Sequence, residues 1–151
     1  MRVLIVEDDQ ASLSYAKKVL EAVGHKVTPV DNGVSAIEEV KSQPFDVVLM
    51  DMRMPCVCGL ETTRAIRGLE SSGHLEQLNR GKRLHIIAYT GMAMHQDKIN
   101  CLEAGMDDFL AKPTRKADLL GAVEKALKSA RPPPPPRFAK KHLPMGLRPL
   151  L

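Results

Sequence analysis

One short stretch constrains the fold of this chain more than any other: residues 45–55, which read FDVVLMDMRMP. Its four consecutive apolar residues, 47–50, lead directly to Asp51. An unbroken apolar run of this length is typical of a strand covered on both faces, as in a parallel sheet between two layers of helices. Taken alone, Asp51 could be a turn or capping residue. At the carboxyl end of a central parallel strand, however, it would lie at the edge where open α/β sheets bind ligands.

The rest of the chain repeats this pattern. Further strands are predicted at residues 2–6, 27–30, 84–89 and 108–111. Amphipathic helical spacing covers residues 13–23, 36–40 and 116–130, and further helices are predicted at residues 62–69 and 94–104. Strands that alternate with helices predict right-handed crossovers and an α/β fold whose parallel sheet has helices on both faces. The polar segment 70–83 is longer than most connections, and we interpret it as a surface insertion or a helix extension.

The length of 151 residues predicts one domain, and the composition changes after residue 130. Of the 22 basic residues, five lie in 131–151, which leaves 17 beside all 18 acids in the first 130 residues. The globular part is therefore nearly neutral, and direct nucleic-acid binding is not indicated. Residues 131–151 contain seven of the 11 prolines, including five in a row. We expect them to be a basic, proline-rich, disordered tail or a linker.

The compartment is inferred from weaker signals. No apolar run approaches the length of about 20 residues that spans a bilayer, and the chain opens with a predicted strand in place of a signal peptide. The three cysteines (Cys56, Cys58 and Cys101) are odd in number and have no secretory context. We interpret them as reduced thiols and expect a cytoplasmic location without membrane contact.

Polar residues follow several of the predicted strands. They are Glu7 and Asp8 after the first strand, Asp51 after the third, Thr90 after the fourth and Lys112 after the fifth. Because the carboxyl ends of parallel strands meet at one edge, we expect these side chains to converge. Crowded carboxylates repel one another, and a hard divalent cation such as Mg²⁺ relieves that repulsion. With a cation and a hydroxyl beside them, they provide the groups that phosphoryl transfer needs. Asp9 is interpreted as a helix cap.

At these positions the sequence resembles the receiver domain of two-component response regulators. The resemblance covers residues 1 to about 130 and is carried by Val6-Glu7-Asp8, Asp51-Met-Arg-Met-Pro55-x-x-x-Gly59, Thr90-Gly91 and Lys112-Pro113. It implies a flavodoxin-like, doubly wound (βα)5 fold with the strand order 2-1-3-4-5. It also implies a phosphorelay function, in which a sensor histidine kinase or a histidine phosphotransfer domain is the donor and an unknown protein is the downstream partner.

The resemblance also implies roles for single residues. Asp51 would be the phosphoacceptor. Glu7 and Asp8 would hold Mg²⁺ together with Asp51, and Arg53 would contribute its backbone carbonyl to the metal. Lys112 would pair with the acceptor or its phosphate.

Two further roles concern the conformational switch that follows phosphorylation. Thr90 would move toward the phosphoryl oxygens, and the Phe109 ring would turn inward when the threonine moves. The Lys112–Pro113 bond would be cis.

Arg53 and Met92 would flank the path of the water that attacks the phosphoryl group, and neither offers a group suited to orient that water. We therefore hypothesise that hydrolysis is slow enough for onward transfer.

Three alternatives stay open. An aspartyl-phosphate-forming phosphatase or phosphotransferase would need a second acid two residues after its nucleophile, where this chain has Arg53. A degenerate receiver would serve only protein contacts, but Asp51, Asp8, Thr90 and Lys112 are all present. Within the receiver interpretation, Met1 directly before the first strand favours a stand-alone regulator. The segment 70–83 and the run 86–90 look more like the receiver of a hybrid kinase.

Overall fold

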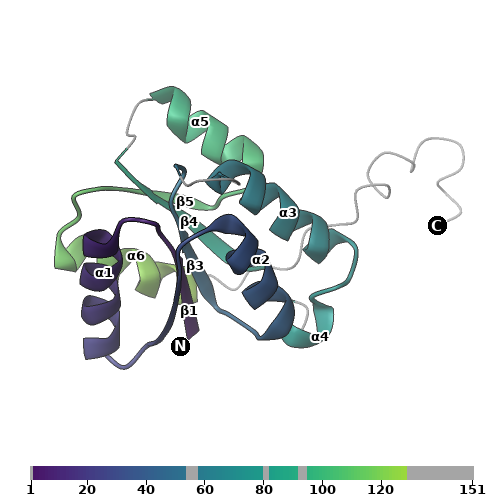
Figure 1. The fold of residues 1–151 in the computed structure, drawn as a ribbon, viewed down its shortest axis with the longest axis horizontal. Helices are drawn as coiled ribbons and strands as arrows, with labels where there is room; N and C mark the ends of the chain where they lie inside the picture. Colours follow the sequence, from purple (N-terminus) through teal and green to yellow (C-terminus); the bar gives the residue numbers. More distant parts are fainter. Residues whose placement is uncertain (1, 54–57, 80–81, 92–94, 129–151) are drawn as a thin grey trace, which may run out of the picture.

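The computed structural model describes residues 2–53, 58–79, 82–91 and 95–128. In these ranges strands and helices alternate along the chain, apart from two consecutive helices before the fourth strand (Figure 1). The order is β1 (Arg2–Val6), α1 (Gln10–Ala22), β2 (Lys26–Val30), α2 (Gly33–Ser42), β3 (Val47–Met50), α3 (Gly59–Ser71), α4 (Glu76–Asn79), β4 (His85–Thr90), α5 (His95–Ala104), β5 (Asp108–Ala111) and α6 (Lys116–Lys128). The predicted tail, 131–151, lies outside the described residues.

The five strands form one parallel sheet in the order β2-β1-β3-β4-β5. This confirms the predicted fold class and the strand order that the resemblance implied. Strand β3 lies at the centre, and all four of its residues are buried. An apolar residue at every position fits a strand with helices against both faces, because no side of it meets water.

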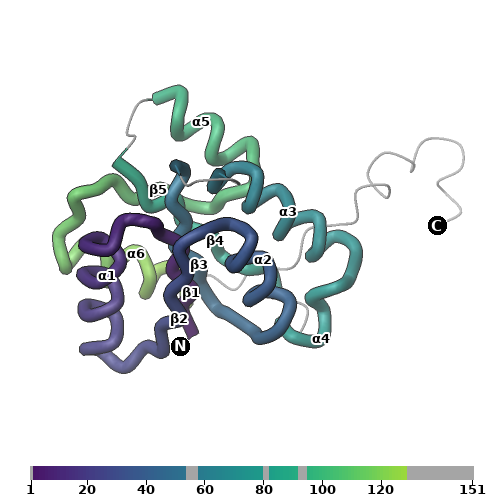
Figure 2. The backbone as a smooth tube through the Cα atoms, viewed as in Figure 1, coloured from purple at the N-terminus to yellow at the C-terminus, as the bar shows by residue number. Residues whose placement is uncertain are grey.

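Two separate apolar cores lie on the two faces of the sheet. In Figures 1 and 2, α1 and α6 lie on one side of the sheet, while α2 and α3 lie on the other. Alternation along β3 divides its side chains between the cores: Val47 and Leu49 pack toward α1 and α6, whereas Val48 and Met50 pack toward α2, α3 and α5. The sheet is therefore clamped between two layers, which fixes where its strand ends lie.

The segment 70–83 is largely as predicted. It extends α3 to Ser71, as expected for a helix extension, and it also contains the short helix α4. Most of its described residues are exposed or half-buried, as expected for a surface segment, but Leu75 is only 2% exposed and belongs to the core beside α2 and α3. The polar composition did not indicate this anchor, because one apolar side chain among polar neighbours is enough to hold a short segment against the core.

A buried ion network ties the end of α3 to the start of β4 and β5. Arg67 Nη2 lies 2.7 Å from Asp107 Oδ2, and Arg67 Nη1 lies 2.7 Å from Glu70 Oε1. Arg83 Nη2 lies 2.9 Å from Asp107 Oδ1, and the Ile86 amide donates to Asp107 Oδ2 at 2.9 Å. The Asp107 side chain is 1% exposed. Two cations and two anions thus balance one another at the amino-terminal edge of the sheet.

Along the described residues, no helix has the length and apolar character required to cross a membrane.

Replacing Asp107 by Asn should lower the free energy of unfolding by about 3 kcal/mol at neutral pH, because Arg67 and Arg83 would both lose a buried counter-charge. Burial alone would raise the pKa of Asp107, but Arg67, the Ile86 amide and Arg83 outweigh it and lower that pKa. A lowered native pKa stabilises the fold above the unfolded value, near pH ~4, and this contribution is lost as the pH falls through the native pKa. Urea unfolding at several pH values should therefore show the two proteins converging in acid.

The matched control is Asp118→Asn, which removes an exposed ion pair with Arg115. Solvent screens such a pair, so its loss should leave the unfolding curve nearly unchanged. Equal losses in the two variants would contradict a special contribution from the buried network.

Candidate functional site

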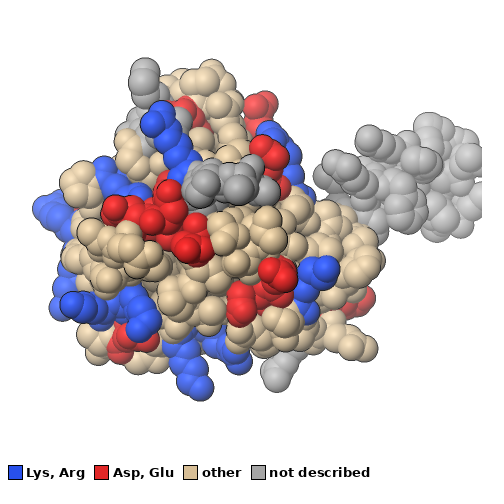
Figure 3. Space-filling view, in the orientation of Figure 1, with Lys and Arg blue, Asp and Glu red and all other residues tan. Residues whose placement is uncertain are grey.

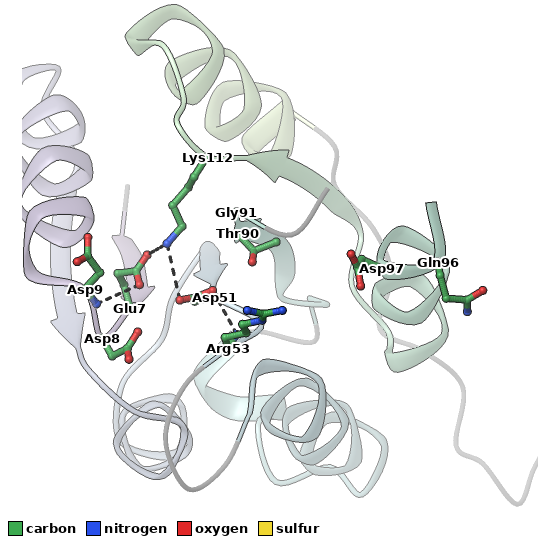
Figure 4. Close-up of a pocket in the computed structure, with 10 residues that line it drawn as sticks. All are labelled: Glu7, Asp8, Asp9, Asp51, Arg53, Thr90, Gly91, Gln96, Asp97 and Lys112. Atoms are coloured by element: carbon green, nitrogen blue, oxygen red, sulfur yellow. Dashed lines mark hydrogen bonds and ion pairs between the residues drawn. The ribbon is translucent and has the colours of Figure 1, made fainter. Parts of the chain in front are cut away.

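Side chains from the ends of five elements, β1, β3, β4, α5 and β5, line one cleft of about 800 Å³ at the carboxyl edge of the sheet. Figure 3 shows acidic side chains gathered on this part of the surface, between α1 and α5. Figure 4 shows the lining residues, which are Glu7, Asp8, Asp9, Asp51, Arg53, Thr90, Gly91, Gln96, Asp97 and Lys112. The acids, hydroxyl and amine that sequence analysis placed at one edge therefore lie together. Phe109, the predicted switch residue, does not line this cleft.

The acids after β1 occupy different environments. Glu7 is fully buried, and its Oε2 accepts a hydrogen bond from the Asp9 amide at 3.2 Å. Asp8 is exposed and contributes a carboxylate from the rim. Asp9 caps α1, accepting a hydrogen bond from the Ser12 amide at 2.9 Å, as predicted. The strand end thus directs two carboxylates toward the cleft and uses the third to begin a helix.

Asp51 follows β3 and is 5% exposed. Its amide donates to the Val6 carbonyl at 3.0 Å, which extends the pairing of β1 with β3 by one residue. Its Oδ1 accepts a hydrogen bond from the Arg53 amide at 3.3 Å, and its Oδ2 lies 3.7 Å from Lys112 Nζ. One carboxylate oxygen therefore meets the loop backbone while the other meets the lysine.

Carboxylate oxygens of Glu7, Asp8 and Asp51 all lie within 4.8 Å of one another. Burial raises the pKa of Glu7 to about 7, and a hydrogen bond with Asp51 adds to the rise, although Lys112 opposes it. A shift in this direction is expected where acids crowd together out of water. The three carboxylates suit a hard divalent cation, because such ions take oxygen ligands and relieve this repulsion.

Lys112 reaches into the cleft from the residue after β5 (Figure 4). Its ammonium pairs with Glu7 as well as facing Asp51, and its amide donates to the Thr90 carbonyl at 2.9 Å. The Lys112–Pro113 bond is cis, as the resemblance implied. A single lysine therefore contacts acids from two strands.

Thr90 ends β4, is 1% exposed and lines the cleft. Phe109 lies in β5 and is half-buried against the core next to α5, with Lys98 Nζ 5.5 Å from its ring centroid. These positions are compatible with a threonine–phenylalanine switch, which stays a prediction. So does the metal ligation by the Arg53 carbonyl. Met92 lies outside the described residues.

Two residues of the cleft were not predicted from the sequence: Gln96 and Asp97, in the first turn of α5. Their position after β4 was the available signal, because a helix that follows a parallel strand begins at the carboxyl edge. With them, the lining contains five acids against the two bases Arg53 and Lys112. The cleft therefore carries an excess of negative charge, which a metal ion would reduce.

Gly59 opens α3 directly against the loop that carries Asp51. Its amide donates to the Met52 carbonyl at 3.1 Å. A Cβ at this position would overlap the Asp51 carbonyl oxygen and lie 2.9 Å from Met52 Cα. Only glycine allows this close approach without moving the backbone.

Comparison with known families identifies a match over most of the chain. A family model described as the response regulator receiver domain matches residues 3–124. Sensor histidine kinase GacS of Pseudomonas protegens is 42% identical over 124 residues, which are 82% of this chain and 13% of that protein. Hybrid signal transduction histidine kinase B of Dictyostelium discoideum is 40% identical over 121 residues, which are 79% of this chain and 6% of that protein. The chain thus spans only a small part of these relatives.

A solved structure gives the same result for the fold. The receiver domain of sensor histidine kinase PA1611 from Pseudomonas aeruginosa superposes with a TM-score of 0.73 at 35% identity. The match covers 85% of this chain and 98% of that one. That structure is described with a magnesium ion coordinated in its active-site cleft.

Replacing Gly59 by Ala should destabilise the protein by roughly 2 kcal/mol and shift the backbone around Asp51, because the new methyl group would overlap the Asp51 carbonyl. Urea unfolding gives the stability, and amide chemical shifts of residues 50–53 report the displacement.

The control is Gly68→Ala in the same helix, where the added Cβ meets nothing within 4 Å. It should stabilise the helix by about 0.5–1 kcal/mol and leave those amide shifts in place. Unchanged Asp51 shifts in the Gly59 variant would refute the close-approach argument.

Proposed function

Since the chain belongs to the response regulator receiver family, which works in two-component phosphorelays, we propose that Asp51 accepts a phosphoryl group from a phosphohistidine. One observation carries this assignment. The Asp51 carboxylate lies in a cleft between a lysine and two further acids, with one oxygen 3.7 Å from the lysine nitrogen. Among the described residues, these three acids form the only group whose oxygens converge closely enough to bind a metal ion.

We assign Glu7, Asp8 and Asp51 as the residues that hold Mg²⁺, with the Arg53 carbonyl as a further ligand. The support is the convergence of the three carboxylates within 4.8 Å and the magnesium in the cleft of the solved P. aeruginosa relative. When bound, the ion would neutralise charge that develops on the phosphoryl oxygens.

In the transfer step, an oxygen of Asp51 would attack phosphorus as the bond from phosphorus to the donor's imidazole nitrogen breaks. The electron pair of that bond stays on the imidazole, and an acyl phosphate forms on Asp51. Lys112 would then pair with the new phosphate, and the Thr90 hydroxyl would donate to one of its oxygens. Movement of Thr90 and Phe109 would change the surface that a downstream partner meets.

The donor would be a sensor histidine kinase or a histidine phosphotransfer domain. Its support is that the curated relatives named above are histidine kinases in which the matching segment is a small part. Both arrangements considered from the sequence, a single-domain regulator and the receiver of a hybrid kinase, are compatible with this donor. We propose that the chain modifies only itself, in contrast to a phosphatase, and no contact among the described residues of the cleft favours that alternative.

Incubation of the protein with acetyl phosphate and Mg²⁺ should add one phosphoryl group to Asp51, because a small phosphodonor needs only an aligned carboxylate and a neutralised cleft. Intact-mass spectrometry should show the added mass in the wild type and none in Asp51→Asn. Chelation of Mg²⁺ should suppress the reaction in the wild type.

The matched control is Asp31→Asn, at an exposed turn aspartate after β2. Asp31→Asn should gain one phosphoryl group, as the wild type does. Sustained turnover of phosphomonoesters would contradict a self-modifying receiver and support the phosphatase alternative.

The phosphoryl group should persist for minutes or longer, because the Arg53 side chain in the cleft has no acceptor with which to orient an attacking water. Loss of the added mass after removal of acetyl phosphate measures the lifetime. Arg53→Glu, which places a water-binding carboxylate there, should shorten it by about tenfold or more. A wild-type half-life of seconds would overturn this prediction.

A further inference from the structure

Tyr89, which sequence analysis treated only as part of a strand, lies directly beneath the lysine of the cleft. Lys112 Nζ is 5.1 Å from the centroid of the Tyr89 ring. We propose that Tyr89 is a positioning residue whose ring face holds the Lys112 ammonium where it meets Asp51. The inference rests on the proposed function of the cleft and adds a residue to it.

Packing in the apolar core holds the Tyr89 ring independently of the lysine. Tyr89 is 2% exposed and belongs to the core formed with α1 and α6, on the same face of the sheet as Ile87. Thr90, the next residue along β4, lines the cleft. Successive residues of one strand therefore serve the site from two sides: the threonine directly, and the tyrosine through the lysine.

The lysine needs such a contact because packing alone does not fix its head group. Lys112 lines both the main cleft and a second hollow of about 730 Å³, which also borders Tyr15 and Tyr89. Its side chain is 17% exposed. With open space on two sides, the ammonium is located by its attraction to Glu7, to Asp51 and to the ring.

An aromatic ring suits this task better than another acid. The ring face attracts a cation through its quadrupole and does not need to occupy an N–H donor of the ammonium. The attraction grows as the pair is withdrawn from water, and the Tyr89 ring is only 2% exposed. The donors of Lys112 stay available for Glu7, for Asp51 and for the oxygens of an incoming phosphoryl group.

The ring acts as a neutral phenol. Burial raises the pKa of Tyr89 to about 12, and the negative charge of Glu7 contributes to the rise. The contact is therefore one of a cation with an aromatic face and not an ion pair. It follows that phenylalanine should replace tyrosine in this function, whereas an aliphatic side chain of similar bulk should not.

The alternative is that Tyr89 only fills the core. Three variants separate the two roles: Tyr89→Phe keeps the ring, Tyr89→Leu removes it, and Ile87→Ala damages the same core on the same strand without touching the ring. Two quantities are measured for each full-length variant. The first is the chemical shift of the Lys112 ε-methylene protons, and the second is the rate of phosphorylation by acetyl phosphate at saturating Mg²⁺.

We expect the Lys112 ε-protons to show an upfield ring-current shift in the wild type, in Tyr89→Phe and in Ile87→Ala, and to lose it in Tyr89→Leu. Phosphorylation should slow by about 3- to 30-fold in Tyr89→Leu, the range of a partly to fully desolvated cation–π contact. Tyr89→Phe and Ile87→Ala should stay within threefold of the wild type.

A Tyr89→Leu rate within threefold of the wild type would overturn the inference, as would a Phe variant as slow as the Leu variant. An equally slow Ile87→Ala would assign the effect to core damage and overturn it too. If the wild type takes no phosphoryl group, the proposed function fails, and the proton shifts alone decide whether the ring holds the lysine.

Discussion

The structure depends on one electrostatic constraint: three carboxylates must be held within a few ångströms of one another at the end of a sheet. Glu7, Asp8 and Asp51 come from two neighbouring strands, and their oxygens lie within 4.8 Å. Their mutual repulsion opposes folding, so it must be offset by the rest of the domain. Two apolar cores supply that stabilisation, because they clamp β1 and β3 from both faces and leave the strand ends no freedom to separate.

The contacts around Asp51 show how closely the backbone enforces this arrangement. The Asp51 amide pairs with Val6, Gly59 packs against the Asp51 carbonyl, and the Arg53 amide binds one carboxylate oxygen. Each contact restricts the acid without neutralising it. Charge compensation is left to Lys112, whose position depends on Glu7, Asp51 and the Tyr89 ring. A group that is fixed in place but only partly neutralised is well prepared to react.

The sequence predicted the parts of this site that follow from chain direction. Thr90 ends a strand, and Asp51 and Lys112 each follow one directly. Parallel strands bring such residues to one edge whatever their side-chain contacts. The unpredicted parts depend on tertiary packing. The burial of Leu75, the approach of Asp97 from α5 and the stacking of Lys112 on Tyr89 join residues far apart in the chain. Periodicity shows that Tyr89 lies in a strand, but not which side chain crosses over its ring.

The two edges of the sheet differ in charge balance, and this difference explains where change can occur. At the amino-terminal edge, Arg67 and Arg83 match Glu70 and Asp107, so the buried charges are paired and any movement would separate them. At the carboxyl edge, the five acids of the cleft face two bases. A cation reduces that imbalance and a phosphoryl group increases it. Either change alters the electrostatic free energy of the cleft. The balanced edge therefore holds β4 and β5 in place, while the unbalanced edge of the same strands can respond to what binds there.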